Sequence, residues 1–270
     1  MTGAAAPFPY RLVATDLDGT LLCSDDSVSA RTREALTAAT AAGAAHIVVT
    51  GRGVRWTRHI LDELGYEGLA VCGQGSQVYD VGAHRLLTSI TLDRQLASLA
   101  LAKIEAEVGP LFLAASRAGL DGEVLVGPGY AGVGSLPFVP LTAPSDLWAE
   151  PLSKIYIQHP TLSADELTKV AARTAGGFVT VTMAGEGIVE LLPLGLSKAK
   201  GLSLAARRLG LKPADTIAFG DMPNDVPMFA WAARGVAMAN AHAELRAVAD
   251  EVTSSNDEDG IAVVLERMLA

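Results

Sequence analysis

Two hydrophobic patterns alternate at the start of the chain. Short apolar runs predict buried strands, and longer segments with apolar residues three or four positions apart predict helices. The first five predicted elements are strand, helix, strand, helix and strand, at residues 11–15, 29–42, 46–50, 54–64 and 69–72. Strands that alternate with helices are typical of a parallel sheet with helices on its faces.

The same alternation returns after residue 197. The predicted elements there are helix, strand, helix, strand, strand and helix, at residues 198–209, 216–219, 223–232, 235–238, 251–253 and 258–269. We therefore expect both ends of the chain to build one α/β core, a Rossmann-like parallel sheet.

The middle of the chain has a less regular pattern. A hairpin is predicted at residues 77–88, and helices are predicted at 93–108 and 164–175. Further strands are predicted at residues 123–126, 153–158, 178–182 and 188–191. This order is typical of an α+β domain. We expect residues 1–82 and 197–270 to form a discontinuous core, with residues 83–196 inserted as a second domain.

Composition narrows the possible partners and the compartment. The chain has 270 residues, 50% of them hydrophobic, and a formal net charge of −9. This acidic balance argues against nucleic acid or an anionic membrane as a partner, since both require basic patches. Cys23 and Cys72 show no metal or disulfide spacing, and we find neither a signal peptide nor an apolar run long enough to span a membrane. We expect a cytoplasmic protein; the sequence carries no signal for its oligomeric state.

Polar motifs follow three of the predicted core strands, and a fourth opens a helix. They are DLDGT at residues 16–20, TGR at 50–52, GDMPND at 220–225 and SKAKG at 197–201. Each motif alone is as well explained by a turn or a helix cap. However, ligands of open parallel sheets bind at the carboxyl ends of the strands, where these motifs would meet.

Together the motifs indicate phosphoryl transfer. Asp16, Asp18, Asp221 and Asp225 would converge at one sheet edge, and clustered carboxylates repel one another unless a cation lies among them. Magnesium, held by few carboxylates and several waters, is the hard cation that fits. A lysine at a helix N-terminus, with a threonine hydroxyl and free backbone N–H groups, would bind an anion nearby. A metal beside an anion site is typical of phosphoryl-transfer enzymes.

In their order along the chain, DLDGT, TGR, SKAKG and GDMPND, the four motifs resemble those of the haloacid dehalogenase-like (HAD) phosphatase superfamily. Residues 196–211 and 235–268 also resemble its Cof-type branch, subfamily IIB. The resemblance covers nearly all of both core segments, and the insert lies where this branch carries an α/β cap of type C2. It implies a Mg²⁺-dependent phosphomonoester hydrolase that acts on small phosphorylated metabolites, such as sugar phosphates or cofactor phosphates, through an aspartyl-phosphate.

The resemblance implies two catalytic residues. Asp16 would be the nucleophile that forms the aspartyl-phosphate. Asp18 would be the general acid and base, protonating the leaving alkoxide and then activating water. Side chains two positions apart on extended backbone point the same way, so both acids can share one site.

The resemblance also implies the groups that bind phosphate and metal. Thr50, Gly51, Lys198 and Asn224 would bind the phosphoryl group. Lys198 is favoured over Lys200 because the spacing to the end of the helix matches the branch without a gap. The metal residues would be Asp16, Asp18 through its backbone carbonyl, Asp221 as a ligand, and Asp225 in support of the metal's water shell.

Gln74 is a departure from the branch, since it stands where asparagine is usual, in a loop expected near the leaving group. Arg52 has two open interpretations, a structural ion pair or a substrate contact. Two alternative functions also remain open: a phosphomutase of the same superfamily, and a non-catalytic metabolite-binding protein. The second acid of DLDGT argues against a dehalogenase, which has no use for it.

Overall fold

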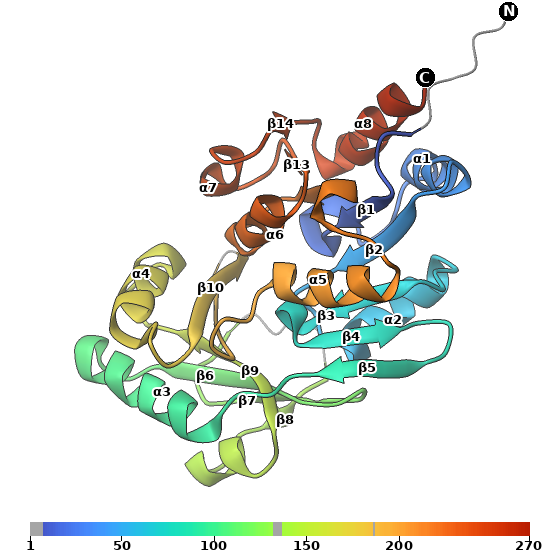
Figure 1. Cartoon of the computed structure of the whole chain (residues 1–270). Coiled ribbons are helices and arrows are strands. Elements are labelled where there is room, and N and C mark those ends of the chain that lie inside the picture. The colour runs from blue at the N-terminus through green and yellow to red at the C-terminus, as the bar shows by residue number, and fades with distance from the viewer. Residues whose placement is uncertain (1–7, 132–136, 186) are drawn as a thin grey trace, which may run out of the picture.

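The computed structural model describes residues 8–131, 137–185 and 187–270. Figure 1 shows two sheets, one in the upper and one in the lower part of the molecule, each covered by helices. The first sheet has eight strands and the second has six. The mixed α/β fold class expected from the sequence is confirmed, with a parallel sheet in the core.

The first sheet is built from both ends of the chain. Its strand order is β14 (Glu251–Val252), β13 (Arg234–Ala237), β12 (Thr216–Gly220), β1 (Leu12–Thr15), β2 (Ala45–Val49), β3 (Leu69–Cys72), β4 (Gln77–Asp80) and β5 (Arg85–Ser89). The six strands from β14 to β3 are parallel, and β4 and β5 add an antiparallel hairpin. Strand β1 therefore lies at the centre, between β12 and β2.

Helices cover both faces of this sheet because its strands are apolar on both sides. Val13 packs into one hydrophobic cluster, whereas its neighbours Leu12 and Ala14 pack into another on the opposite face. Helices α1 (Ala30–Ala41), α2 (Val54–Glu63) and α8 (Gly260–Leu269) supply the first cluster. Helices α5 (Lys198–Arg208), α6 (Val226–Trp231) and α7 (Ala243–Arg246) supply the second.

The second sheet is covered by helices on one face only. Its strand order is β10 (Thr180–Gly185), β11 (Ile188–Leu192), β9 (Leu152–Gln158), β6 (Phe112–Arg117), β7 (Val124–Val126) and β8 (Val139–Pro140). Helices α3 (Arg94–Val108) and α4 (Ala164–Ala175) bury one face, where Ile155 and Ile157 point. The alternate residue Tyr156 lies on the other face, beside Ala114 of β6. That open face lines a cavity shared with the first sheet.

The sheet order refines the expected domain division. The expected boundary between residues 82 and 83 falls in the turn between β4 and β5, yet both strands belong to the first sheet. The division into a core and an inserted cap stays a prediction, and the strand pairing favours placing its first boundary after β5. The second expected boundary, at 196/197, falls directly before α5.

Most predicted elements are present, and the differences have local causes. Strand β6 is missing from the sequence prediction, because its residues FLAASR contain two alanines and no β-branched residue. The strand predicted at residues 178–182 corresponds to β10, which begins later, at Thr180, and extends to Gly185. Within the described residues, none of the helices is both long enough and apolar enough to cross a membrane.

We predict that His46 makes stability depend on pH. The ring is partly buried beside Tyr66, its Nε2 lies 2.8 Å from Thr15 Oγ1, and burial lowers its pKa from 6.5 to about 4. Between these values the unfolded chain binds a proton that the folded chain does not. Stability is therefore present in full above pH 6.5 and is lost as pH falls towards 4. The expected loss is about 1–3 kcal/mol.

Urea unfolding at a series of pH values measures this loss. His46→Gln should flatten the dependence in that range, whereas His59→Gln, which changes an exposed histidine on α2, should keep the wild-type slope. Equal slopes in the wild type and His46→Gln would contradict the assignment.

Candidate active site

The two aspartates of DLDGT lie where β1 ends. The Asp16 backbone N–H donates to the Phe219 carbonyl at 3.0 Å, which continues the pairing of β1 with β12 by one residue. Asp16 is buried and the Asp18 carboxylate is half exposed, and both line one cavity of about 640 Å³ between the two sheets. The turn after Asp18 needs Gly19, which has φ +69° and whose added Cβ would clash with Asp221.

Lys198 is the cation at the centre of the site. It is the first residue of α5, after the N-cap Ser197, and only 1% of it is exposed. Its Nζ lies 2.8 Å from Asp16 Oδ1 and 2.8 Å from Asp225 Oδ1. Burial alone would lower the pKa of Lys198, but the two carboxylates raise it above its ordinary value. Lys200 is exposed, so Lys198 is the lysine that reaches Asp16.

Three carboxylates surround this lysine and outnumber it. One oxygen from each of Asp16, Asp221 and Asp225 lies within 4.8 Å of the others. Burial raises the pKa of Asp16 well above its ordinary value, and Lys198 offsets this only in part. Burial and the nearby Asp225 raise the pKa of Asp221 to about 7. The site therefore has more buried negative charge than its own residues neutralise.

A divalent metal ion fits this donor set. Asp16 and Asp221 offer carboxylate oxygens, and oxygen is the ligand that Mg²⁺ prefers. Both oxygens of Asp225 already have protein partners. Its Oδ1 accepts from Lys198, and its Oδ2 accepts from the backbone N–H groups of Asp221 and Met222 at 3.1 Å each. Asp225 therefore holds the loop in place and orients the lysine.

The Asp18 carboxylate lies apart from this trio and pairs with Arg52. Arg52 Nε lies 3.0 Å from each Asp18 oxygen, and Nη2 also donates to Oδ1. The same Nη2 reaches Asp26 at 3.5 Å. Of the two interpretations of Arg52, the structure shows the ion pair. The carboxylate of Asp18 takes no part in the acidic trio, so only its backbone carbonyl stays predicted at the metal.

The TGR loop after β2 presents donors to the cavity. Thr50 is fully buried, and its Oγ1 accepts the backbone N–H of Arg52 at 3.0 Å. Thr50 is not among the residues that line the cavity, so its contact with a phosphoryl group stays a prediction. The next residue, Gly51, lines the cavity, and its carbonyl accepts from Lys154 Nζ at 2.7 Å.

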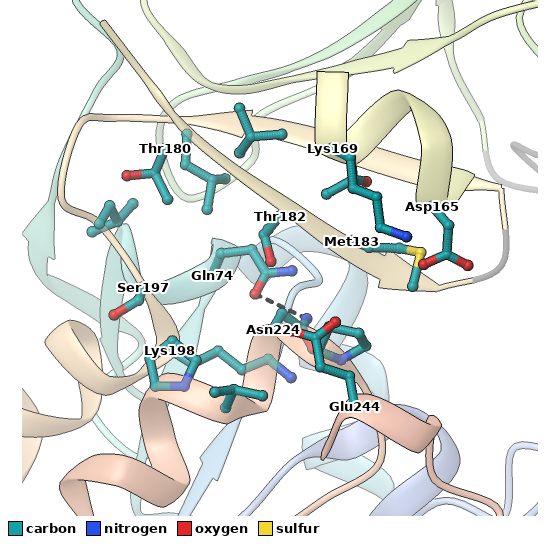
Figure 2. Close-up of a pocket in the computed structure, with 17 residues that line it drawn as sticks. Gln74, Asp165, Lys169, Thr180, Thr182, Met183, Ser197, Lys198, Asn224 and Glu244 are labelled. Atoms are coloured by element: carbon teal, nitrogen blue, oxygen red, sulfur yellow. Dashed lines mark hydrogen bonds between the residues drawn. The ribbon is translucent and has the colours of Figure 1, made fainter. Parts of the chain in front are cut away.

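A series of hydrogen-bonded, buried polar side chains connects this loop to the second sheet, and connects the second sheet in turn to two other loops of the first sheet. Lys154 pairs with Glu190, whose second oxygen accepts from Gln74 Nε2 at 2.7 Å. Gln74 Oε1 accepts in turn from Asn224 Nδ2 at 3.1 Å. Figure 2 shows Gln74 and Asn224 pointing toward each other in a smaller adjoining cavity that Lys198 also lines. Asn224 Oδ1 is buried with no donor among the described residues, so it can accept a further hydrogen bond.

The sequence reasoning missed Lys154 and Glu190. Each is a charged residue inside an apolar strand, in LSKIYIQ and IVELL. A buried charge within a strand indicates a paired group, and that signal was available. The sequence did not indicate which residue each charge pairs with, because β9 and β11 are brought together only by the tertiary structure. The extra length of Gln74 over asparagine is what lets it reach Glu190 while it also holds Asn224.

The sequence profile of the haloacid dehalogenase-like hydrolases matches residues 13–265. The chain belongs to the haloacid dehalogenase-like hydrolase family. The 5-amino-6-(5-phospho-D-ribitylamino)uracil phosphatase YwtE of Bacillus subtilis is 28% identical to it and covers 96% of this chain and 98% of its own. The HMP-PP phosphatase of Serratia proteamaculans is 29% identical and covers 96% of each chain. This HAD family member is a phosphatase of the Cof type.

Solved structures with the same fold include two relatives of lower identity. SMU.1108c from Streptococcus mutans has a TM-score of 0.83 at 23% identity, and covers 96% of this chain and 99% of its own. The HAD subclass IIB sugar phosphatase BT4131 has a TM-score of 0.79 at 21% identity, with coverage of 95% and 98%. These likenesses show the fold of both sheets.

We predict that the buried Lys154–Glu190 pair stabilises the contact between the sheets. Lys154→Met leaves the Glu190 carboxylate buried without its cation, and should lower the free energy of unfolding by about 3–5 kcal/mol. Lys154→Met combined with Glu190→Gln should recover part of this loss, because no charge is then left unpaired. Thermal and urea unfolding measure both effects.

Lys169→Met is the matched control, since it removes an exposed lysine from helix α4. It should change stability by less than about 0.5 kcal/mol. A Lys154→Met variant as stable as this control would show that the pair contributes nothing.

Proposed function

We propose that the protein hydrolyses small phosphorylated metabolites in the cytoplasm, with Mg²⁺ as cofactor and Asp16 as nucleophile. The observation that carries the proposal is the position of Asp16, a buried carboxylate held by Lys198 beside a second carboxylate, Asp221. Two relatives, named as phosphatases of a phosphorylated uracil derivative and of HMP-PP, support small phosphorylated substrates.

In the first step Asp16 attacks the phosphorus atom of the substrate. Lys198 orients the attacking carboxylate and, with the Thr50 hydroxyl and the Gly51 N–H, neutralises charge on the phosphoryl oxygens. As the bond from phosphorus to the ester oxygen breaks, Asp18 gives its proton to that oxygen. Arg52 contacts both Asp18 oxygens, so Asp18 can turn one oxygen to the substrate and keep the other on Arg52. The products are an alcohol and an aspartyl-phosphate on Asp16.

In the second step the same groups act in reverse. Asp18 takes a proton from water, and the water oxygen attacks the phosphorus atom of the aspartyl-phosphate. The bond from phosphorus to Asp16 breaks, phosphate is released, and the carboxylate is restored. Mg²⁺, held by Asp16, Asp221 and the Asp18 carbonyl, would supply positive charge for the phosphoryl group throughout.

We expect phosphate release from p-nitrophenyl phosphate in the presence of Mg²⁺. EDTA should abolish it, and Asp16→Asn should lower kcat by at least about three orders of magnitude, because the amide is not a nucleophile. Absorbance of p-nitrophenol measures the rate. Activity that survives Asp16→Asn would contradict the mechanism, and a wild type without activity would favour a phosphomutase or a binding protein.

We also expect Mg²⁺ to stabilise the folded protein. A cation that binds only the folded state at one hundred times its Kd adds about 2.7 kcal/mol. The melting temperature should therefore rise with MgCl₂, and Asp221→Asn should remove most of the rise by deleting a ligand. NaCl at equal ionic strength is the control. An equal rise in the wild type and in Asp221→Asn would place the ion elsewhere.

A further inference from the structure

The cavity above Asp16 has an apolar, aromatic side. It is formed by the open face of the second sheet, where Tyr156 of β9 lies beside Ala114 and Val124. Tyr130, from the segment after β7, lies against Tyr156 with ring centroids 6.3 Å apart and planes inclined by 59°. Trp56 of α2 reaches the same cluster from the first sheet's side. Asp16 lies in the same cavity, so a substrate's leaving group would occupy this space.

The charges around the cavity leave no cation for a second anionic group. Among the described residues that line it, the cations are Arg52, Lys154 and Lys198. Arg52 pairs with Asp18, Lys154 with Glu190, and Lys198 with Asp16, where the phosphoryl group binds. Residues 132–136 and 186 contain no lysine or arginine. A leaving group with its own phosphate would meet the carboxylates of Asp18, Asp26 and Glu190 and no free cation among the described residues.

The aromatic side offers few free hydrogen-bond partners; one is the Trp56 indole N–H, which is buried with no acceptor among the described residues. Lys154 donates to Glu190 and to the Gly51 carbonyl, and Glu190 also accepts from Gln74. The Tyr156 hydroxyl lies 2.9 Å from Ser116 Oγ. The neighbouring residues Ala114 and Val124 have no polar side-chain atoms. A polyol would find one free buried donor here, Trp56 Nε1, and would otherwise lose its hydrogen bonds to water, which disfavours it.

We propose that this side of the cavity binds an uncharged, planar aromatic ring in the leaving group. Lys154 Nζ lies over the Tyr156 ring, 4.7 Å from its centroid. The ligand ring would therefore pack on Tyr130 and against the remaining surface of Tyr156, in the offset or edge-on arrangements that aromatic pairs prefer. The enzyme therefore selects phosphomonoesters of ring-bearing alcohols over those of polyols, and over bisphosphates. This inference rests on the proposed phosphatase function and narrows it to a substrate class.

The test compares esters whose leaving groups have similar intrinsic reactivity. Benzyl phosphate carries a planar ring, cyclohexylmethyl phosphate a puckered ring of the same carbon count, and glycerol 3-phosphate no ring. We expect kcat/KM for benzyl phosphate to exceed both others by about tenfold or more, which corresponds to one aromatic contact. Fructose 1,6-bisphosphate should be the poorest substrate. The preference should appear mainly in KM, since the ring binds away from the reacting atoms.

Variants then assign the preference to the two rings. Tyr130→Leu and Tyr156→Leu should reduce the ratio of benzyl to cyclohexylmethyl phosphate towards one. Tyr156→Phe keeps the ring without its hydroxyl and should retain the ratio, which also guards against loss of folding in Tyr156→Leu. Phe138→Leu is the control, because Phe138 is an exposed aromatic residue between β7 and β8 that does not line the cavity.

The outcomes separate this inference from the proposed function. Hydrolysis of all three monoesters with equal kcat/KM would overturn the ring site and leave the phosphatase intact. A ratio unchanged in Tyr130→Leu and Tyr156→Leu, with both variants folded by thermal melting, would also overturn it. No hydrolysis of any ester, p-nitrophenyl phosphate included, would instead reject the phosphatase function itself.

Discussion

The buried contact of Lys198 with Asp16 and Asp225 is the interaction on which the site depends. A lone ammonium or carboxylate in this interior would be costly, so each requires the others. The contact ties the start of α5 to the segments that follow β1 and β12, and thereby joins the N-terminal and C-terminal parts of the first sheet. Because the lysine is shared between two carboxylates and a third lies close by, negative charge remains in excess. That excess suits a divalent cation and, with it, an anionic phosphoryl group.

The second sheet closes the site through an equally constrained contact. Lys154 and Glu190 are buried, and they reach Gly51 and Gln74 at the ends of two core strands. Gln74 in turn accepts a hydrogen bond from Asn224, which lies in the segment after β12. The position of the loop proposed to bind phosphate is thus linked to the position of the second sheet. The open face of the second sheet also carries Tyr156, with Tyr130 against it. In the proposed reaction, one surface would therefore both cover the phosphoryl group and contact the leaving group.

Much of this arrangement could be predicted from the sequence. The strand and helix rhythm gave the α/β core, and the position of Asp16, Asp221 and Lys198 after predicted strands or at a helix start indicated one shared edge. Periodicity works there because buried parallel strands are apolar on both faces. It failed for β6, whose alanine-rich residues form a strand only because β9 and β7 lie on either side. Lys154, Glu190 and the Arg52–Asp18 pair depend on contacts between distant segments, which no local pattern specifies.

The covalent role of Asp16 is the central claim, and trapping the intermediate tests it most directly. Asp18→Asn should still transfer the phosphoryl group from p-nitrophenyl phosphate, because that leaving group needs little protonation, but it should hydrolyse the aspartyl-phosphate slowly. Acid quenching followed by peptide mass spectrometry should then find one phosphoryl group on Asp16. A phosphoryl group on another residue, or turnover with no covalent adduct at any time, would contradict the account.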